Sequence, residues 1–375
     1  MKNKYFKTAL CLGVGVITLT AAVFANYDNA NGYSVCKNAA KSMLYETNYT
    51  MHTKLDIKID GESLSKYDAV YQTAGGQNPM RYISNTYYER STPSDDFKTS
   101  KYESYRQDNC DISINTDSNG MQSSYVYEMY NSDDTQSYDS DDGSLIGNRS
   151  EMTEKVINFA ELACDALVGD LKNSIILVDS KDDKNTYNIS LSENQMPELI
   201  SSGISLLIGS TKQSLAESAR LYAEHPEDYG DVDDKIFIND TMLYGGDPTV
   251  DSVNGTVTVL NNGKPESLDG SLYISGIGKD GKHHVLEVSV SLNFSNYGTT
   301  SIEKRDINSL PSAVIYDGDG AITIIKDSDS TAEMQTKAQS NFNMYSEGGY
   351  SHVYLKDQNG NIIAESSGRD DSDDQ

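Results

Sequence analysis

Tryptophan is absent from this chain, and cysteine, histidine and proline are scarce, with four, five and seven copies among 375 residues. A disulfide framework or a zinc site needs more cysteines at regular spacing, and no C-x-x-C pair occurs. Neither H-E-x-x-H nor G-x-S-x-G is present. We therefore expect no metal, no cofactor and no catalytic residues, and we predict that this protein is not an enzyme.

The cysteines leave two interpretations open. If the first 25 residues are removed, Cys36, Cys110 and Cys164 remain, which is an odd number. One disulfide between Cys36 and Cys164 and three buried thiols are both compatible with this set.

Basic residues are also few: 30 lysines and arginines face 57 aspartates and glutamates, for a net charge of −27. A surface this acidic repels phosphate backbones and anionic headgroups, so we exclude nucleic acid and disfavour peripheral membrane binding. Solubility outside the cell is the simplest role for such a charge. With so many acids, no single carboxylate pair identifies a hydrolase, which we keep as the weakest alternative.

The N-terminus carries an export signal. Lys2, Lys4 and Lys7 precede an uncharged run over residues 8–25, and small residues occupy the positions before a cut after Ala25. As a helix the run spans about 27 Å, slightly less than a hydrocarbon core of about 30 Å. We predict that residues 1–25 are a cleaved signal peptide or an N-terminal membrane anchor, and that the remainder is extracytoplasmic. Only an uncleaved anchor would attach it to the membrane.

The clearest strand covers residues 285–294, V-L-E-V-S-V-S-L-N-F. Its apolar and polar residues alternate, so one face is dry and the other is wet. Burial of the apolar side chains contributes roughly 8–15 kcal/mol, whereas ordering ten residues costs roughly 10–20 kcal/mol. The dry face therefore needs an apolar cover.

Helical periodicity marks four segments, the last of them with Leu215, Ala219, Tyr222 and Ala223, and those that begin at Ser150 and Pro197 are the candidate covers for this face. Ser34 can cap a short first helix, Ser150 caps the most regular one, and Pro197 fits the first turn of a third. The helix after Ser150 has an apolar stripe of Met152, Val156, Phe159, Ala160, Ala163, Leu167 and Leu171.

Tyrosine-rich strands fill residues 67–130, which suits a half-exposed sheet face more than sugar stacking or adhesive contact. Further strands are predicted near residues 174–190, 235–294 and 321–325, and a hairpin over 353–364 turns at Asn359-Gly360. The acidic loop over residues 131–148 does not fit an EF-hand, because Arg149 falls where the bidentate acid belongs.

One motif resembles a phosphate-binding loop. Residues 276–282 read G-x-x-x-x-G-K, but His283 follows where Ser or Thr should hold magnesium. A strand follows instead of the helix whose N-terminus would bind the phosphate. We interpret the segment as a tight hairpin turn.

Three segments carry a family resemblance: L-V-G-D-L-K-N ending at Asn173, N-Q-M-P-E-L from Asn194, and D-G-K-H-H-V-L-E-V-S-V-S-L-N-F-S-N-Y-G-T-T ending at Thr300. Over residues 35–307 the chain resembles LolA/LppX-like half-barrels of the lipoprotein-carrier type, including exported proteins of Gram-positive bacteria. The resemblance implies an α+β fold in which a curved antiparallel β-sheet, a half-barrel, wraps over a few α-helices. It also implies a cleft for acyl chains or another protein.

These observations define four expected regions: residues 1–25 as signal or anchor, 34–310 as the half-barrel domain, 311–365 as a C-terminal strand and hairpin extension, and 366–375 as a disordered acidic tail. The function we expect is non-enzymatic binding of a lipid-like ligand or an envelope protein between sheet and helices. The alternative is the ectodomain of a membrane-anchored envelope regulator or sensor. The predicted cleft-lining residues are Phe159, Leu167, Ile204, Val288, Val290 and Leu292.

Overall fold

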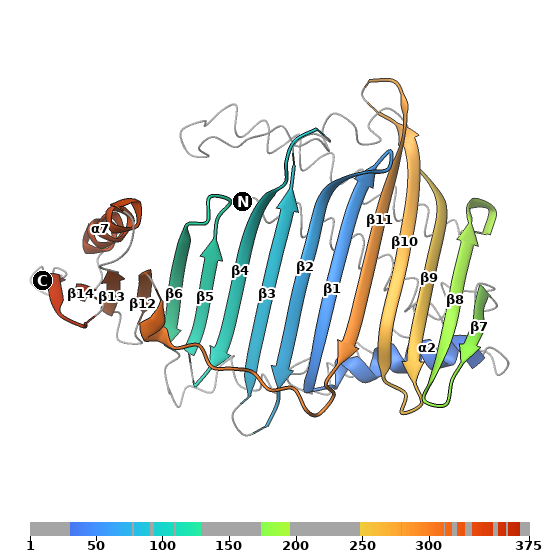
Figure 1. Cartoon of the computed structure of the whole chain (residues 1–375), viewed down its shortest axis with the longest axis horizontal. Helices are drawn as coiled ribbons and strands as arrows, with labels where there is room; N and C mark the ends of the chain where they lie inside the picture. Colours follow the sequence, from blue (N-terminus) through green and yellow to red (C-terminus); the bar gives the residue numbers. More distant parts are fainter. Residues whose placement is uncertain are drawn as a thin grey trace, which may run out of the picture.

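The described part of the computed structural model contains 15 strands and two α-helices (Figure 1). This part comprises residues 31–76, 79–90, 94–108, 110–128, 174–195, 248–278, 280–310, 312–316, 321–326, 332–347, 352–357 and 359–367. The elements are α2 (Asn31–Leu44), β1 (Asn48–Ile59), β2 (Glu62–Ala74), β3 (Met80–Glu89), β4 (Lys98–Gln107), β5 (Cys110–Thr116), β6 (Gln122–Glu128), β7 (Ile175–Ser180), β8 (Lys184–Ser192), η2 (Glu193–Gln195), β9 (Thr249–Leu260), β10 (Pro265–Ile277), β11 (His283–Ser295), η3 (Ile307–Ser309), β12 (Ser312–Tyr316), β13 (Ala321–Lys326), α7 (Ala332–Glu347), β14 (His352–Asp357) and β15 (Ile362–Ser367).

All described strands belong to one sheet, in the order β15-β14-β13-β12-β6-β5-β4-β3-β2-β1-β11-β10-β9-β8-β7. Neighbours are antiparallel except at two joins, β12 with β6 and β13 with β14. The pairing of β1 with β11 joins segments more than 200 residues apart in the sequence. Within the described ranges, neither helix is long and apolar enough to span a membrane.

The alternation predicted for residues 285–294 is confirmed in β11. Leu286, Val288 and Val290 are buried, and Val290 pairs with Leu55 of β1. They share a core with α2, which contributes Tyr33, Cys36 and Ala39. We call the face that carries α2 the inner face and the opposite one the outer face; in Figure 1 α2 lies behind the strands, so the outer face points to the viewer. The helices predicted after Ser150 and Pro197 lie outside the described residues.

The predicted fold class is wrong. Instead of an α+β half-barrel wrapped over helices, the described residues form an open, mostly antiparallel sheet of 15 strands with two α-helices. The period-two pattern predicted the individual strands, but no local pattern marks the two parallel joins that extend the sheet beyond β6. Strands β12 to β15 therefore continue the same sheet.

Two smaller cores lie on opposite faces at the β12 end of the sheet. On the inner face, Ala338 of α7 packs among Val314, Ile322, Ile324, Val353 and Leu355. On the outer face, Leu310 packs among Ile112, Ile114 and Val126. The segment over residues 301–310 thus covers the outer face of β5 and β6 but not that of β1 or β11.

The glycine-rich motif over residues 276–282 is a hairpin turn, as predicted. Gly278 N–H donates to the carbonyl of Lys282, and Gly281 has a φ of 75°, which favours glycine. β11 begins directly afterwards at His283, so a strand and not a helix follows the loop.

Cys36 is a free thiol. Cys36 is buried, and burial raises its pKa to about 12, so it packs as a small apolar side chain. Cys110 is half-buried, and Cys164 lies outside the described residues. The structure therefore favours thiols over a disulfide at Cys36.

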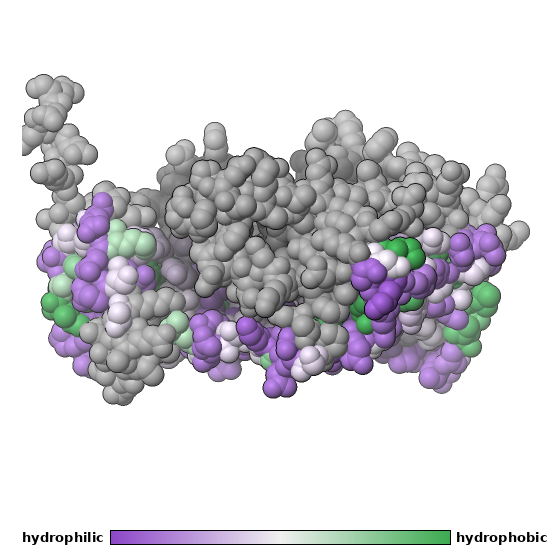
Figure 2. Space-filling model, turned by 90° about the horizontal axis from the view of Figure 1, so that it is seen from above, coloured by the Kyte–Doolittle hydropathy of each residue, from purple (hydrophilic) through white to green (hydrophobic). Residues whose placement is uncertain are grey.

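Of the eight large apolar side chains that are exposed among the described residues, five lie on the two edge strands of the sheet. They are Ile176, Leu177 and Val178 on β7, and Ile362 and Ile363 on β15. Figure 2 shows hydrophobic patches near both ends of the molecule, with mostly hydrophilic residues along the margin between them.

Candidate ligand-binding groove

The predicted cleft-lining residues that are described lie on the inner face of β11. Val288 and Val290 are 5% and 4% exposed and belong to the core, whereas Leu292 is half-buried beside it. Phe159, Leu167 and Ile204 lie outside the described residues. A cleft between them and β11 stays a prediction.

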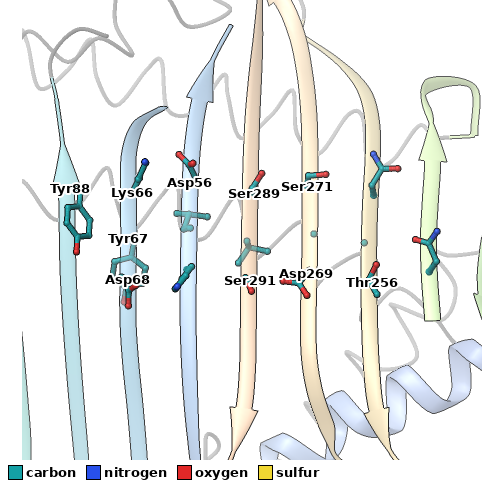
Figure 3. A pocket seen from close by; sticks show the side chains of 17 residues that line it. Asp56, Lys66, Tyr67, Asp68, Tyr88, Thr256, Asp269, Ser271, Ser289 and Ser291 are labelled. Atoms are coloured by element: carbon teal, nitrogen blue, oxygen red, sulfur yellow. The ribbon is translucent and has the colours of Figure 1, made fainter. Parts of the chain in front are cut away.

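A cavity of about 590 Å³ lies on the outer face and crosses seven strands, from β3 to β8. We call it the outer groove (Figure 3). Its lining residues are Lys54, Leu55, Asp56, Lys66, Tyr67, Asp68, Tyr88, Asn188, Asn254, Gly255, Thr256, Asp269, Gly270, Ser271, Ser289, Val290 and Ser291.

Strand register arranges the polar lining residues in two rows across the sheet. The first row is Asp68, Lys54, Ser291, Asp269, Thr256 and Asn188. The second is Tyr88, Lys66, Asp56, Ser289, Ser271 and Asn254. On each strand the rows are two residues apart, which is about 6.5 Å, and Figure 3 shows them one above the other.

The floor between the rows is backbone. The intervening residues are Leu55, Tyr67, Val290, Gly270 and Gly255, which pair side by side across the sheet. Leu55, Tyr67 and Val290 point their side chains to the inner face, where Leu55 and Val290 are buried. Val290, predicted as a cleft residue, thus contributes backbone to a groove on the other side.

Charge is concentrated at the β2–β1 end of the groove. Lys54 lies across from Asp68, and Lys66 lies across from Asp56. The carboxylate of Asp56 accepts hydrogen bonds from Ser63 Oγ at 2.7 and 3.0 Å. Asp68 Oδ1 is 2.6 Å from His52 Nε2, just outside the groove. These contacts hold both carboxylates against the sheet.

The half of the groove over β11, β10, β9 and β8 is lined by short uncharged side chains, with Asp269 as its acid among the described residues. Ser190 Oγ donates to Asn254 Oδ1 at 2.9 Å, so the two N–H donors of this amide are the part left for a ligand. Ser289 donates to Glu287, which also binds Lys58. Burial alone would raise the pKa of Glu287, but these hydrogen bonds hold it below its ordinary value.

Aromatic residues mark the β3 end. Tyr88 lines the groove beside Lys66, and the Lys66 ammonium lies 5.2 Å from the ring centroid of Phe97. Arg90 lies 4.9 Å from the same centroid. Phe97 is thus held next to the groove by two cations.

The sequence did not reveal this groove, because the outward-facing residues of each strand, taken alone, have the polar pattern of any solvent-exposed sheet face. The available signal was the kind of polar residue. Ser289, Ser271 and Asn254 are short, at outward positions where long charged side chains would fill the space above a sheet. Only the register shows that these positions are adjacent.

The described residues contain no group of three or more His, Cys, Asp or Glu side chains placed to hold a metal ion. Acid chemistry in the groove is limited to Asp56, Asp68 and Asp269 among the described lining residues. The two rows of polar side chains can donate and accept hydrogen bonds along a ligand that lies across the strands.

Comparisons with known proteins give little. No family model and no curated protein matches the chain. Among solved structures, LprF from Mycobacterium bovis is 11% identical with a TM-score of 0.27, covering 73% of this chain and 96% of LprF. A LolA superfamily protein from Nitrosomonas europaea is 10% identical with a TM-score of 0.16, covering 72% and 94%. TM-scores below 0.5 establish no shared fold, so the ligand must be argued from the groove itself.

Proposed function

We propose that this protein is an extracytoplasmic, non-enzymatic binding protein that holds an extended polar ligand in the outer groove. One observation supports this proposal most directly. Two rows of hydrogen-bonding side chains run side by side across the groove's seven strands, with exposed backbone between them. A cavity of about 590 Å³ is in the range of specific small-molecule sites.

A solvated sheet face is the alternative explanation of these residues, because antiparallel sheets often expose one polar face. It does not account for the hollow. On a solvated face, long side chains such as Lys and Glu lie over the strands, whereas Ser, Thr and Asn leave the backbone of Gly255 and Gly270 uncovered. The short residues are what makes the groove.

The extracytoplasmic location is proposed from the N-terminal segment and the acidic composition. If residues 1–25 are retained, the groove belongs to the ectodomain of a membrane-anchored protein, which preserves the regulator or sensor alternative. Sequencing the N-terminus of the exported protein separates the two forms, since a chain that begins at Asn26 has no anchor.

The binding proposal is tested by filling the groove. Ser271→Trp places an indole between the rows, and Ser267→Trp is its control, on the same strand and face but outside the groove. Each purified protein is incubated with cell-envelope extracts, and retained molecules are identified by native mass spectrometry. Material retained by the wild type and Ser267→Trp, but not by Ser271→Trp, supports the proposal. Equal retention by all three proteins rejects it.

A second candidate function, binding of an apolar ligand on the inner face, is favoured by a gap among the apolar side chains. Gly255 and Gly270 pair between Val290 and Ile189, so this row lacks two side chains. Of the described atoms, the Asp269 carbonyl oxygen is nearest to a Cβ added at Gly255, at 3.5 Å. Co-purified lipid that is lost in Gly255→Leu would support this candidate. Preparations of the wild type without lipid would count against it.

A further inference from the structure

We infer that the ligand of the outer groove is an uncharged, extended glycan chain that lies across the strands. This inference rests on the proposed function and specifies its ligand class. The argument uses the spacing of the rows, the chemistry of their side chains and the charge of the molecule.

The groove has a periodic structure. Neighbouring strands are about 4.8 Å apart, so the six side chains of each row span about 24 Å, and the whole groove spans about 29 Å from β3 to β8. A pyranose ring in an extended glycan advances the chain by a length similar to the spacing of neighbouring strands. One sugar unit can therefore lie over each strand and meet one residue from each row.

The side chains match hydroxyl-bearing rings. Asn188, Thr256 and Ser271 can both donate and accept hydrogen bonds. Asn254 has its N–H donors left for a ligand, and Ser289 its acceptor lone pairs. Asp269 adds a carboxylate that can accept hydrogen bonds from two sugar hydroxyls. A sugar hydroxyl also donates and accepts, so every described polar residue of this half finds a partner on such a chain.

The charge of the molecule and of the groove disfavours polyanions and polycations as ligands. A molecule with a net charge of −27 repels polyanions, and three aspartates line the groove itself. A polycation would be attracted to the molecule but would meet Lys54 and Lys66 at the β1 and β2 positions of the groove. An uncharged chain avoids both penalties.

Tyr88 gives the groove an end. It is the lining residue on β3, beyond Lys66, and its ring can pack against the flat face of a terminal sugar. Figure 3 shows Tyr88 at one end of the second row, on the strand beside Lys66. We therefore place one terminus of the bound glycan at β3.

The test is isothermal titration calorimetry with oligomers of β-1,4-linked N-acetylglucosamine from two to six units. Affinity should rise at least about tenfold from dimer to hexamer, because the longer chain reaches more strands. Asn188→Ala with Asn254→Ala should weaken hexamer binding about thirtyfold, since the loss of each amide hydrogen bond weakens binding about fivefold. Ser271→Trp should abolish binding, and Ser267→Trp should leave it unchanged.

Cello-oligomers and malto-oligomers complete the design. Extended cello-oligomers should bind, and malto-oligomers, which coil, should bind at least about tenfold more weakly. Glycan binding that survives Ser271→Trp would overturn the inference by placing the site elsewhere. If no glycan binds while Ser271→Trp still blocks retention of another envelope molecule, the glycan class is wrong and the groove remains a binding site. If the groove retains nothing, both proposals fail.

Discussion

His284 and Asp60 are 224 positions apart in the sequence, and His284 Nδ1 lies 2.7 Å from Asp60 Oδ2. The contact links the β1–β2 turn to the start of β11. Asp280 holds the other side of the ring, with Oδ1 at 3.0 Å from Nε2. The side chain of His284 is 10% exposed. A largely buried imidazole between two carboxylates is stabilised in its protonated form.

This geometry predicts a pH-dependent stability. The hydrogen bonds that the His284 imidazole donates to the carboxylates of Asp60 and Asp280 raise its pKa above the ordinary value of 6.5. Stability from the charged imidazole is therefore fully present below about pH 6.5 and is lost as the pH rises through the raised value. His284→Gln should be less stable than the wild type near pH 6, and the difference should shrink towards pH 9. Urea unfolding from pH 5 to 9 measures it.

His283→Gln is the matched control, because His283 is exposed and neighbours His284 on the same strand. Its stability should follow the wild-type curve at every pH. A constant difference between His284→Gln and the wild type would mean that packing, and not charge, accounts for the loss.

A side chain at Gly278 is expected to clash with the His284 ring. A Cβ at this position would lie 2.7 Å from Cδ2 of His284, closer than side chains pack. Gly278→Ala should displace the ring from Asp280 and destabilise the protein by about 1–3 kcal/mol. It should also weaken the pH dependence. In Gly255→Ala, the nearest described atom is 3.5 Å away, so its unfolding midpoint should stay close to that of the wild type.

Local sequence predicted the strands and turns with strong signals. The alternation of β11, the hairpin β7–β8 and the turn at Gly360, with a φ of 81°, are all in the structure. Each depends on contacts within a few residues or on a backbone conformation that favours glycine.

Long-range pairing could not be predicted in the same way. Nothing near Leu55 specifies that it pairs with Val290, because many apolar strands would fit the same position. Val314 pairs with Tyr125 in a parallel join, which no turn can encode. The outer groove depends entirely on such pairing, since Asn188 and Asp68 come from opposite ends of the row. The sheet was therefore partly predictable, whereas the candidate site was not.

Gln107 is predicted to hold the segment over residues 301–310 on the outer face. Its amide donates to the carbonyl of Arg305 and accepts from the N–H of the same residue, both at 2.8 Å. Because Gln107 is buried, Gln107→Ala leaves two backbone groups without these partners and should cost about 1–3 kcal/mol. Amide hydrogen exchange in the segment should become faster.

Lys304→Ala provides the comparison within the same segment. It removes an ion pair with Asp108 whose two side chains are more than half exposed. Such pairs contribute at most about 1 kcal/mol, so exchange in the segment should stay slow. Equal effects of the two substitutions would contradict the assigned role of Gln107.

The β7 edge predicts self-association at high salt. Ile176, Leu177 and Val178 are each more than half exposed on a terminal strand, which presents unpaired backbone groups to other chains. The net charge of −27 opposes association at low salt, and salt screens that repulsion. Light scattering of the wild type should therefore increase from about 0.05 M to about 1 M salt.

Leu177→Lys should suppress the increase, because a charge at an edge strand disfavours edge-to-edge pairing. Asn262→Lys adds the same charge in an exposed turn away from this edge and should leave the increase intact. If both lysine variants suppress it equally, association depends on net charge and not on the β7 edge.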